Sequence, residues 1–175
     1  MSSGNKILVW DPLLRLLHWV FFVCFILNYW VLETGGLWHR ITGLLALTAV
    51  LCRLFWGFYG PANARFSVKA LSTQRWRAHF RHIRQRQFDP RQVHNPFGYV
   101  LLYAVLTLFA ALAVTGLLLE EVDYFFGSDR LERIHGTLAD IVFVLACIHI
   151  AAVFIMQWWG KVALIKPMLT GKRRL

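Results

Sequence analysis

Four histidines stand out in this chain because each lies inside, or near the start of, a long apolar stretch. Two of them, His135 and His149, are fourteen residues apart in the stretch 134–159. Fourteen residues of α-helix return to within about 40° of the same face and rise roughly 21 Å. One helix therefore presents two imidazoles on one side, at two depths. Imidazoles in an apolar bundle either hydrogen bond to their neighbours or ligate a metal or haem iron, and two on one face favour ligation.

The composition indicates that these histidines belong to a membrane protein. Of the 175 residues, 58% are hydrophobic and 15% aromatic, which is more than a soluble domain of this size usually carries. We expect an all-α integral membrane protein with a single domain over residues 1–175, folded as a four-transmembrane-helix bundle. The first apolar stretch is too long for a cleavable signal and lacks a small-residue cleavage site, so we expect an uncleaved anchor. Four stretches are long enough to cross the hydrocarbon core: 13–32, 37–58, 97–119 and 134–159.

The distribution of charge predicts how the four helices cross the membrane. The net charge is +10, and most basic residues lie in the loop 59–95 or after the last apolar stretch. The positive-inside rule therefore places both termini and this loop in the cytoplasm, with the protein in the bacterial inner membrane. The basic run 75–87 could bind RNA, but we expect it to face lipid headgroups, in part as an amphipathic helix, and we expect no nucleic-acid partner.

With this topology the four histidines fall into two pairs. His18 in the first stretch and His149 in the last lie at the inner level, and His39 in the second stretch lies at the outer level with His135. Each pair combines two helices, as is needed to hold a planar macrocycle from both faces, so we expect two stacked b haems with bis-histidine ligation. Zinc fits less well because it takes three or four ligands at one point.

The chemistry of such a site is electron transfer. An iron with both axial positions filled by histidine has no open position for oxygen or substrate, so it can only accept and pass on single electrons. Two haems at two depths would form a conduit across the membrane. The three cysteines lie in apolar stretches without a CxxC or CxxCH motif, so we expect packing roles rather than a zinc site, a disulfide or covalent haem.

Two further residues of the second stretch fit this scheme. Gly43 lies one turn after His39, where a missing side chain either makes room for a flat macrocycle or brings two helices together. Arg53 lies fourteen residues after His39 and so faces the same way at the inner level. Its guanidinium could pair with a propionate of the inner haem or extend to the lipid headgroups.

Two helix starts can be located at the inner surface. Asp11 before Pro12 and Asn95 before Pro96 both combine a capping side chain with a proline suited to the first helical position. His94 and Asn95 also lie near the level of the inner haem, where a quinone head could meet a proton-exchanging group. Plain helix capping by this turn is the alternative.

The outer link 120–133 is acidic, with five carboxylates against two arginines, and it directly precedes His135. We expect Glu120, Glu121 and Asp123 to attract a basic redox partner near the outer haem. Alternatively, acids are merely tolerated there, since the positive-inside rule constrains only lysine and arginine. The third stretch, 97–119, carries no histidine, and we expect it only to pack.

Several segments together resemble one known family. They are VWDPLLRLLHW, LWHRITG, CRLFWGFYGPANARFS, HNPFG and the helix that carries His135 and His149. They resemble the prokaryotic di-haem cytochrome b family, which includes the cytochrome b subunit of membrane nickel–iron hydrogenases and bacterial superoxide oxidase. The resemblance covers nearly the whole chain, although the loop 68–93 follows the family pattern poorly. It implies that His18, His39, His135 and His149 ligate two haem b groups, and that electrons pass between the quinone pool and a periplasmic partner.

Three functions are compatible with these observations. The leading one is a di-haem cytochrome b that couples quinone or quinol chemistry to a periplasmic c-type cytochrome or oxidoreductase, as the WDP opening favours. The second is superoxide oxidation with electrons delivered to quinone, which needs a cationic outer surface. Only Arg40, Arg130 and Arg133 would supply it, against an acidic link. The third is a cofactor-free assembly subunit, which a visible spectrum of the reduced protein distinguishes from the other two.

Overall fold

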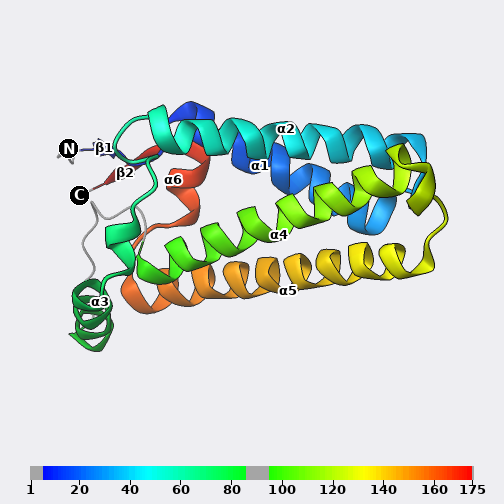
Figure 1. The fold of residues 1–175 in the computed structure, drawn as a ribbon. Coiled ribbons are helices and arrows are strands. Elements are labelled where there is room, and N and C mark those ends of the chain that lie inside the picture. The colour runs from blue at the N-terminus through cyan, green and yellow to red at the C-terminus, as the bar shows by residue number, and fades with distance from the viewer. Residues whose placement is uncertain (1–5, 86–94, 175) are drawn as a thin grey trace.

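The computed structural model describes residues 6–85 and 95–174 and confirms the helical membrane bundle. Four long helices lie side by side, each apolar and long enough to cross a membrane (Figure 1). Their first and last residues lie within a few residues of the predicted boundaries, except at the start of the fourth long helix. Their bounds are Pro12–Ile26 for α1, continued by the π-helix η1 over Leu27–Val31, Leu37–Tyr59 for α2, Pro96–Glu121 for α4 and Asp129–Gly160 for α5.

The two predicted caps at the helix starts are confirmed. A side-chain oxygen of Asp11 accepts a hydrogen bond from the Leu14 N–H at 2.9 Å. The side-chain oxygen of Asn95 likewise accepts from the Gly98 N–H at 2.7 Å. In both helices a proline follows the cap, where its missing N–H costs no hydrogen bond. Each start is therefore encoded in three or four consecutive residues.

Helix α5 begins earlier than the sequence pattern predicts. It starts at Asp129 rather than near residue 134, because the Ser128 hydroxyl accepts a hydrogen bond from the Leu131 N–H at 3.4 Å. Asp129 and Glu132 in the first turn add negative charge where the helix dipole favours it. These polar residues extend α5 to 32 residues. At about 1.5 Å per residue it exceeds the hydrocarbon thickness, so its first turns extend beyond the core of the membrane.

The helices associate as two close pairs. Helix α1 lies along α2, and α4 lies along α5 (Figure 1). The pairs meet in a cluster of buried side chains in which small residues such as Ala46 let the helix backbones approach, as is common in membranes. The cluster consists of Cys24, Ala46, Val50, Phe109 and Leu112. Helix α5 is thus held mainly by α4.

Both chain termini lie at one end of the bundle (Figure 1). Strand β1, Lys6–Leu8, pairs antiparallel with strand β2, Lys172–Arg174. We call this end the basic end, and the opposite one, with the links 32–36 and 122–128, the acidic end. The short helix α6, Ile165–Thr170, precedes β2. The pairing joins segments near the two ends of the chain, so both lie at the same end of the bundle.

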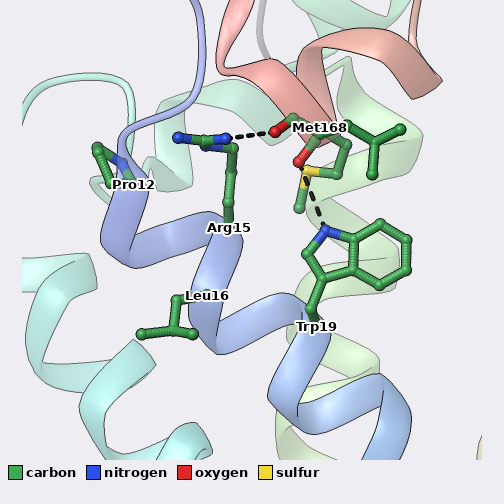
Figure 2. A pocket seen from close by; sticks show the side chains of 6 residues that line it. Pro12, Arg15, Leu16, Trp19 and Met168 are labelled. Carbon is green, nitrogen blue, oxygen red and sulfur yellow. Dashed lines mark hydrogen bonds between the residues drawn. The ribbon is translucent and has the colours of Figure 1, made fainter.

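The start of α1 holds the C-terminal segment at the basic end. The guanidinium of Arg15 donates to the Leu169 carbonyl at 2.5 Å, and the Trp19 indole N–H lies 3.5 Å from the Met168 carbonyl. Figure 2 shows both side chains extending from α1 toward α6, beside an open groove that Pro12 and Leu16 also line. This contact fixes α6 next to the helix that carries His18.

The loop after α2 folds back onto the bundle at the basic end. The Phe66 N–H donates to the Gly57 carbonyl at 2.9 Å, and a Cβ on Gly57 would lie 2.2 Å from the Phe66 ring. Glycine is therefore required at this position. The indole N–H of Trp56 donates to the Asp11 carboxylate at 3.2 Å, so the loop, α2 and the cap of α1 form one unit.

The loop continues through a 3₁₀ turn, Val68–Leu71, into the predicted amphipathic helix, α3, over Thr73–Gln85. The Trp76 ring lies 4.6 Å from that of Phe97 at the start of α4, and the buried His79 ring lies 5.5 Å from Phe97. The arginines of α3 face away from this contact and are exposed. An aromatic cluster therefore anchors α3 to the bundle.

We expect the anchoring of α3 to weaken in acid. Burial, and secondarily the charge of His82, lowers the pKa of His79 below its ordinary value of about 6.5. When α3 is detached from the bundle, His79 binds a proton more readily than when α3 is docked. The free energy of docking is therefore fully present at neutral pH and becomes less favourable as the pH falls below about 6.5. The loss is at most about 1.4 kcal/mol per pH unit. Hydrogen exchange of the α3 amides at pH 7.5 and 5.5, corrected for intrinsic rates, measures this. His79→Leu should abolish the pH dependence, and the exposed-site control His82→Gln should retain it. Equal protection at both pH values would refute the role of His79.

Candidate haem-binding sites

The structure brings together both histidine pairs that the sequence predicts. The rings of His18 on α1 and His149 on α5 have centroids 6.5 Å apart and planes inclined at 63°. The rings of His39 on α2 and His135 on α5 have centroids 6.3 Å apart and planes inclined at 59°. Helix α5 thus contributes one imidazole at each of two levels, facing a different helix at each.

The spacing within each pair fits one iron between two imidazoles. Two metal–nitrogen bonds of about 2 Å on opposite sides of one metal place the ring centres roughly 6 Å apart. Among residues 6–85 and 95–174, no group of three or more histidine, cysteine, aspartate or glutamate side chains is placed to hold a metal ion. Each level offers a pair of ligands, as axial ligation of a macrocycle requires.

There is open space next to the pairs. The side chains of His18 and His149 are exposed, and those of His39 and His135 are half-buried. A Cβ built on Gly43, one turn after His39, would meet no neighbouring atom within 4 Å in the described part of the chain, the nearby backbone of its own helix aside. Gly43 therefore does not serve to bring two helices together, which was one of its two predicted roles. It leaves room on the histidine-bearing face of α2.

The comparison with known families agrees with this geometry. The profile of the family described as prokaryotic cytochrome b561 matches residues 9–171, which include all four histidines. The chain belongs to the prokaryotic cytochrome b561 family. It is thus a multi-pass membrane cytochrome b of the haem b-binding, electron-transferring kind, as the resemblance of its motifs indicates. A search of curated proteins finds no significant match.

Arg53 of this cytochrome b561 lies beside the loop after α2 and has unused hydrogen-bonding capacity. Its guanidinium carbon is 4.8 Å from the centre of the Phe66 ring, and its Nη1 atom is buried with no hydrogen-bond partner among residues 6–85 and 95–174. A buried unpaired donor in a membrane protein normally has a ligand or partner. This arrangement suits a carboxylate of a bound group better than an arginine extended to the headgroups.

The two residues predicted for a quinone site are only partly described. His94 lies outside the described residues. The Asn95 side-chain oxygen is engaged in capping α4. The structure therefore gives Asn95 a structural role, and any part in quinone binding would fall to its side-chain N–H₂ group.

One functional contact of the cytochrome was missed from its sequence. The third apolar stretch was expected only to pack, but Thr115 on α4 places its hydroxyl oxygen 2.9 Å from Nδ1 of His135. A Cβ built on the neighbouring Gly116 would lie 3.1 Å from Cε1 of the same ring. Helix α4 carries no histidine, yet it contacts one of the four directly.

A second missed contact lies between α1 and α5. The Tyr29 hydroxyl donates to the Asp140 carboxylate at 2.8 Å, and the Tyr29 ring stacks on Phe143 at 4.7 Å. Tyr29 belongs to the π-helix η1, and such segments often occur at functional positions. The hydrogen bond supplies a partner for the carboxylate within the span and joins two helices that otherwise touch little.

We expect the Tyr29–Asp140 hydrogen bond to stabilise the bundle. Tyr29→Phe leaves the ring stacked on Phe143 but removes the donor, and polar contacts between membrane helices are worth about 0.6 kcal/mol on average and up to roughly 1.7 kcal/mol. The free energy of unfolding of this variant, measured in mixed micelles, should fall below that of the wild type by an amount in this range. The matched control is Tyr124→Phe, because Tyr124 is 87% exposed in the link after α4. Equal stability of the two variants would contradict a clamping role.

Proposed function

We propose that this cytochrome holds two b haems, one between His18 and His149 and one between His39 and His135. The observation that carries the proposal is the spacing of 6.5 and 6.3 Å between the paired rings. A b haem ligated by two histidines accepts and releases one electron at a time and leaves no position for oxygen or substrate. The histidines fix the depth of each redox centre, and Arg53 would pair with a propionate at the inner level.

The two levels support a role in electron transfer across the membrane. Residues fourteen apart on α5 lie about 21 Å apart along its axis, so His135 and His149 define two centres near opposite membrane surfaces. The basic end would lie in the cytoplasm of the bacterial inner membrane, because Lys69, Lys161 and the arginines of α3 are at that end. We infer that electrons pass between the quinone pool and a periplasmic partner along this axis.

The quinone would exchange electrons at the inner level. The Arg53 guanidinium lies beside Phe66 in the loop after α2, and Asn95, which follows His94 in the sequence, caps the start of α4 at the basic end. Histidine titrates near neutral pH, so His94 could exchange the proton that quinone chemistry requires.

The partner would dock at the acidic end. Glu121, the last residue of α4, and Asp123 in the link that follows are both exposed. Glu120 instead forms an ion pair with Arg40 at 2.7 Å, so its charge is largely compensated. Exposed carboxylates near a redox centre attract a protein with a basic patch, here a c-type cytochrome or an oxidoreductase subunit. The same ion pair removes one of the three outer cations that superoxide oxidation would need, so the structure gives that alternative no specific support.

The test is the haem content of the purified protein. The dithionite-reduced spectrum and the pyridine haemochrome of the full chain should give two non-covalent b haems per chain. A ratio near one would overturn the two-pair assignment. A protein without haem would support the cofactor-free assembly subunit instead.

A further inference from the structure

The contact between Thr115 and His135 defines where the imidazole proton lies. The Thr115 hydroxyl is 3.0 Å from the Ala111 carbonyl and 2.9 Å from the Leu112 carbonyl of its own helix, and it donates to them. A hydroxyl has a single hydrogen, so toward the histidine its oxygen can only accept. With the hydroxyl hydrogen shared between the two carbonyls of its own helix, the donor role in this contact falls to Nδ1 of His135, 2.9 Å away. The proton is held on Nδ1, and Nε2 keeps a free lone pair.

We propose that Thr115 is the positioning residue of the outer haem: its hydroxyl fixes the tautomer and the ring orientation of His135 so that Nε2 is the ligating atom. This inference rests on the proposed haem ligation. Histidine ligands commonly donate their second ring N–H to an acceptor, which orients the ring and makes it a stronger donor to the metal.

Gly116 allows helix α4 to come close enough for this hydrogen bond. A Cβ at Gly116 would lie 3.1 Å from Cε1 and 3.6 Å from Nδ1 of the His135 ring. A methyl group there would push the ring away from Thr115 by a few tenths of an ångström. Thr115 and Gly116 therefore act together, the first by accepting a hydrogen bond and the second by leaving room for it.

Of the two histidines in the outer pair, His135 has a hydrogen-bond partner for its Nδ1 atom among the described residues and His39 does not. Nδ1 of His39, across from His135, is buried and has no hydrogen-bond partner in the described part of the chain. The ring of His39 is thus free to adjust to the bound group, whereas that of His135 is fixed in advance. Loss of the Thr115 hydroxyl should consequently affect the outer haem and leave the inner one unchanged.

The decisive variant is Thr115→Val, which keeps the shape and removes the hydroxyl, compared with Thr115→Ser, which keeps the hydroxyl. The control is Thr48→Val, because Thr48 makes the same bond to its own helix, 2.8 Å to the Leu44 carbonyl, without a histidine. Each protein is purified with its haems and examined by redox titration, by electron paramagnetic resonance of the oxidised state and by haem transfer to apomyoglobin.

In Thr115→Val the outer haem should be released about 10- to 100-fold faster, as expected when a metal ligand loses its hydrogen-bond partner. Its midpoint potential should rise, because a weaker imidazole donor stabilises the ferric state less. Thr115→Ser and Thr48→Val should resemble the wild type. Gly116→Ala should shift the same haem in the same direction, which provides a second test if Thr115→Val folds poorly.

The outcomes separate this inference from the function on which it rests. A wild-type protein with two haems and a Thr115→Val variant identical to it in potential, spectrum and release rate would overturn the positioning role alone. Equal changes of both haems, or the same change in Thr48→Val, would also overturn it. A wild-type protein with fewer than two haems would overturn the proposed ligation, whatever the variants show.

Discussion

Changing His135 to alanine should remove the outer haem and leave the inner haem intact. In the proposed function the outer haem is held by one histidine from α2 and one from α5, so this change would leave His39 as its single ligand. His149→Ala should do the reverse, because it takes one ligand from the pair with His18. The haem content should fall from two per chain to one in either variant. A redox titration should show a single wave, at a different potential in each.

A matched histidine outside the pairs provides the control for this experiment. His82→Ala alters an exposed imidazole on α3 and should keep both haems. The variants His18→Ala and His39→Ala complete the set and should reproduce the phenotypes of their partners, His149→Ala and His135→Ala respectively. Retention of both haems in His135→Ala, or loss of both while the protein remains folded, would contradict the assignment of one haem to each pair.

The histidine pairs could be predicted because they follow from regular geometry. Fourteen residues bring an α-helix back nearly to the same face, so the placement of His135 and His149 needs only the helix period. The distribution of lysine and arginine then gives the direction of each helix, and the depths of His18 and His39 follow. None of these steps requires knowledge of how two helices pack. The caps at Asp11 and Asn95 were equally accessible, since each depends on neighbouring residues alone.

The partners of these histidines could not be predicted in the same way. Thr115 is one of several hydroxyl residues in apolar helices, and most of them bond back to their own helix, as Thr48 does. Its contact with His135 depends on the rotation of α4 against α5, which no local pattern specifies. The pattern T–G at residues 115–116, a hydroxyl beside a small residue, was the available signal.

The contacts across α1 and at the chain ends depend on other non-local features. The π-helical turn in η1 shifts the register of α1, so the direction of Tyr29 toward Asp140 departs from the ordinary helix period. Strands β1 and β2 are three residues each, which is too short for an alternating pattern to be recognised. Their pairing joins segments more than 160 residues apart in the sequence, which no local pattern indicates.

Neutralising the exposed carboxylates of the acidic end should slow electron transfer to a basic partner. The relevant residues are Glu121 and Asp123, since Glu120 is already paired with Arg40. Electrostatic attraction raises association rates by about ten-fold or more at low ionic strength and is screened by salt. Glu121→Gln with Asp123→Asn should therefore slow oxidation of the reduced cytochrome by a soluble basic c-type cytochrome by roughly that factor.

The salt dependence of the electron-transfer rate, together with a matched control variant, distinguishes docking of the partner at Glu121 and Asp123 from a general effect of protein charge. Rates of the double variant and the wild type should converge as salt is added, because screening removes the attraction in both. Adding Glu120→Gln should slow transfer further, since it leaves the Arg40 cation unpaired next to His39. Glu33→Gln, an exposed carboxylate in the other link at the same end, should change the rate much less. Quinol-driven reduction of the haems should be equal in all of these proteins, because the proposed quinone site is at the basic end. If the double variant keeps the wild-type rate at low salt, or if Glu33→Gln slows transfer as much, Glu121 and Asp123 do not form the docking surface.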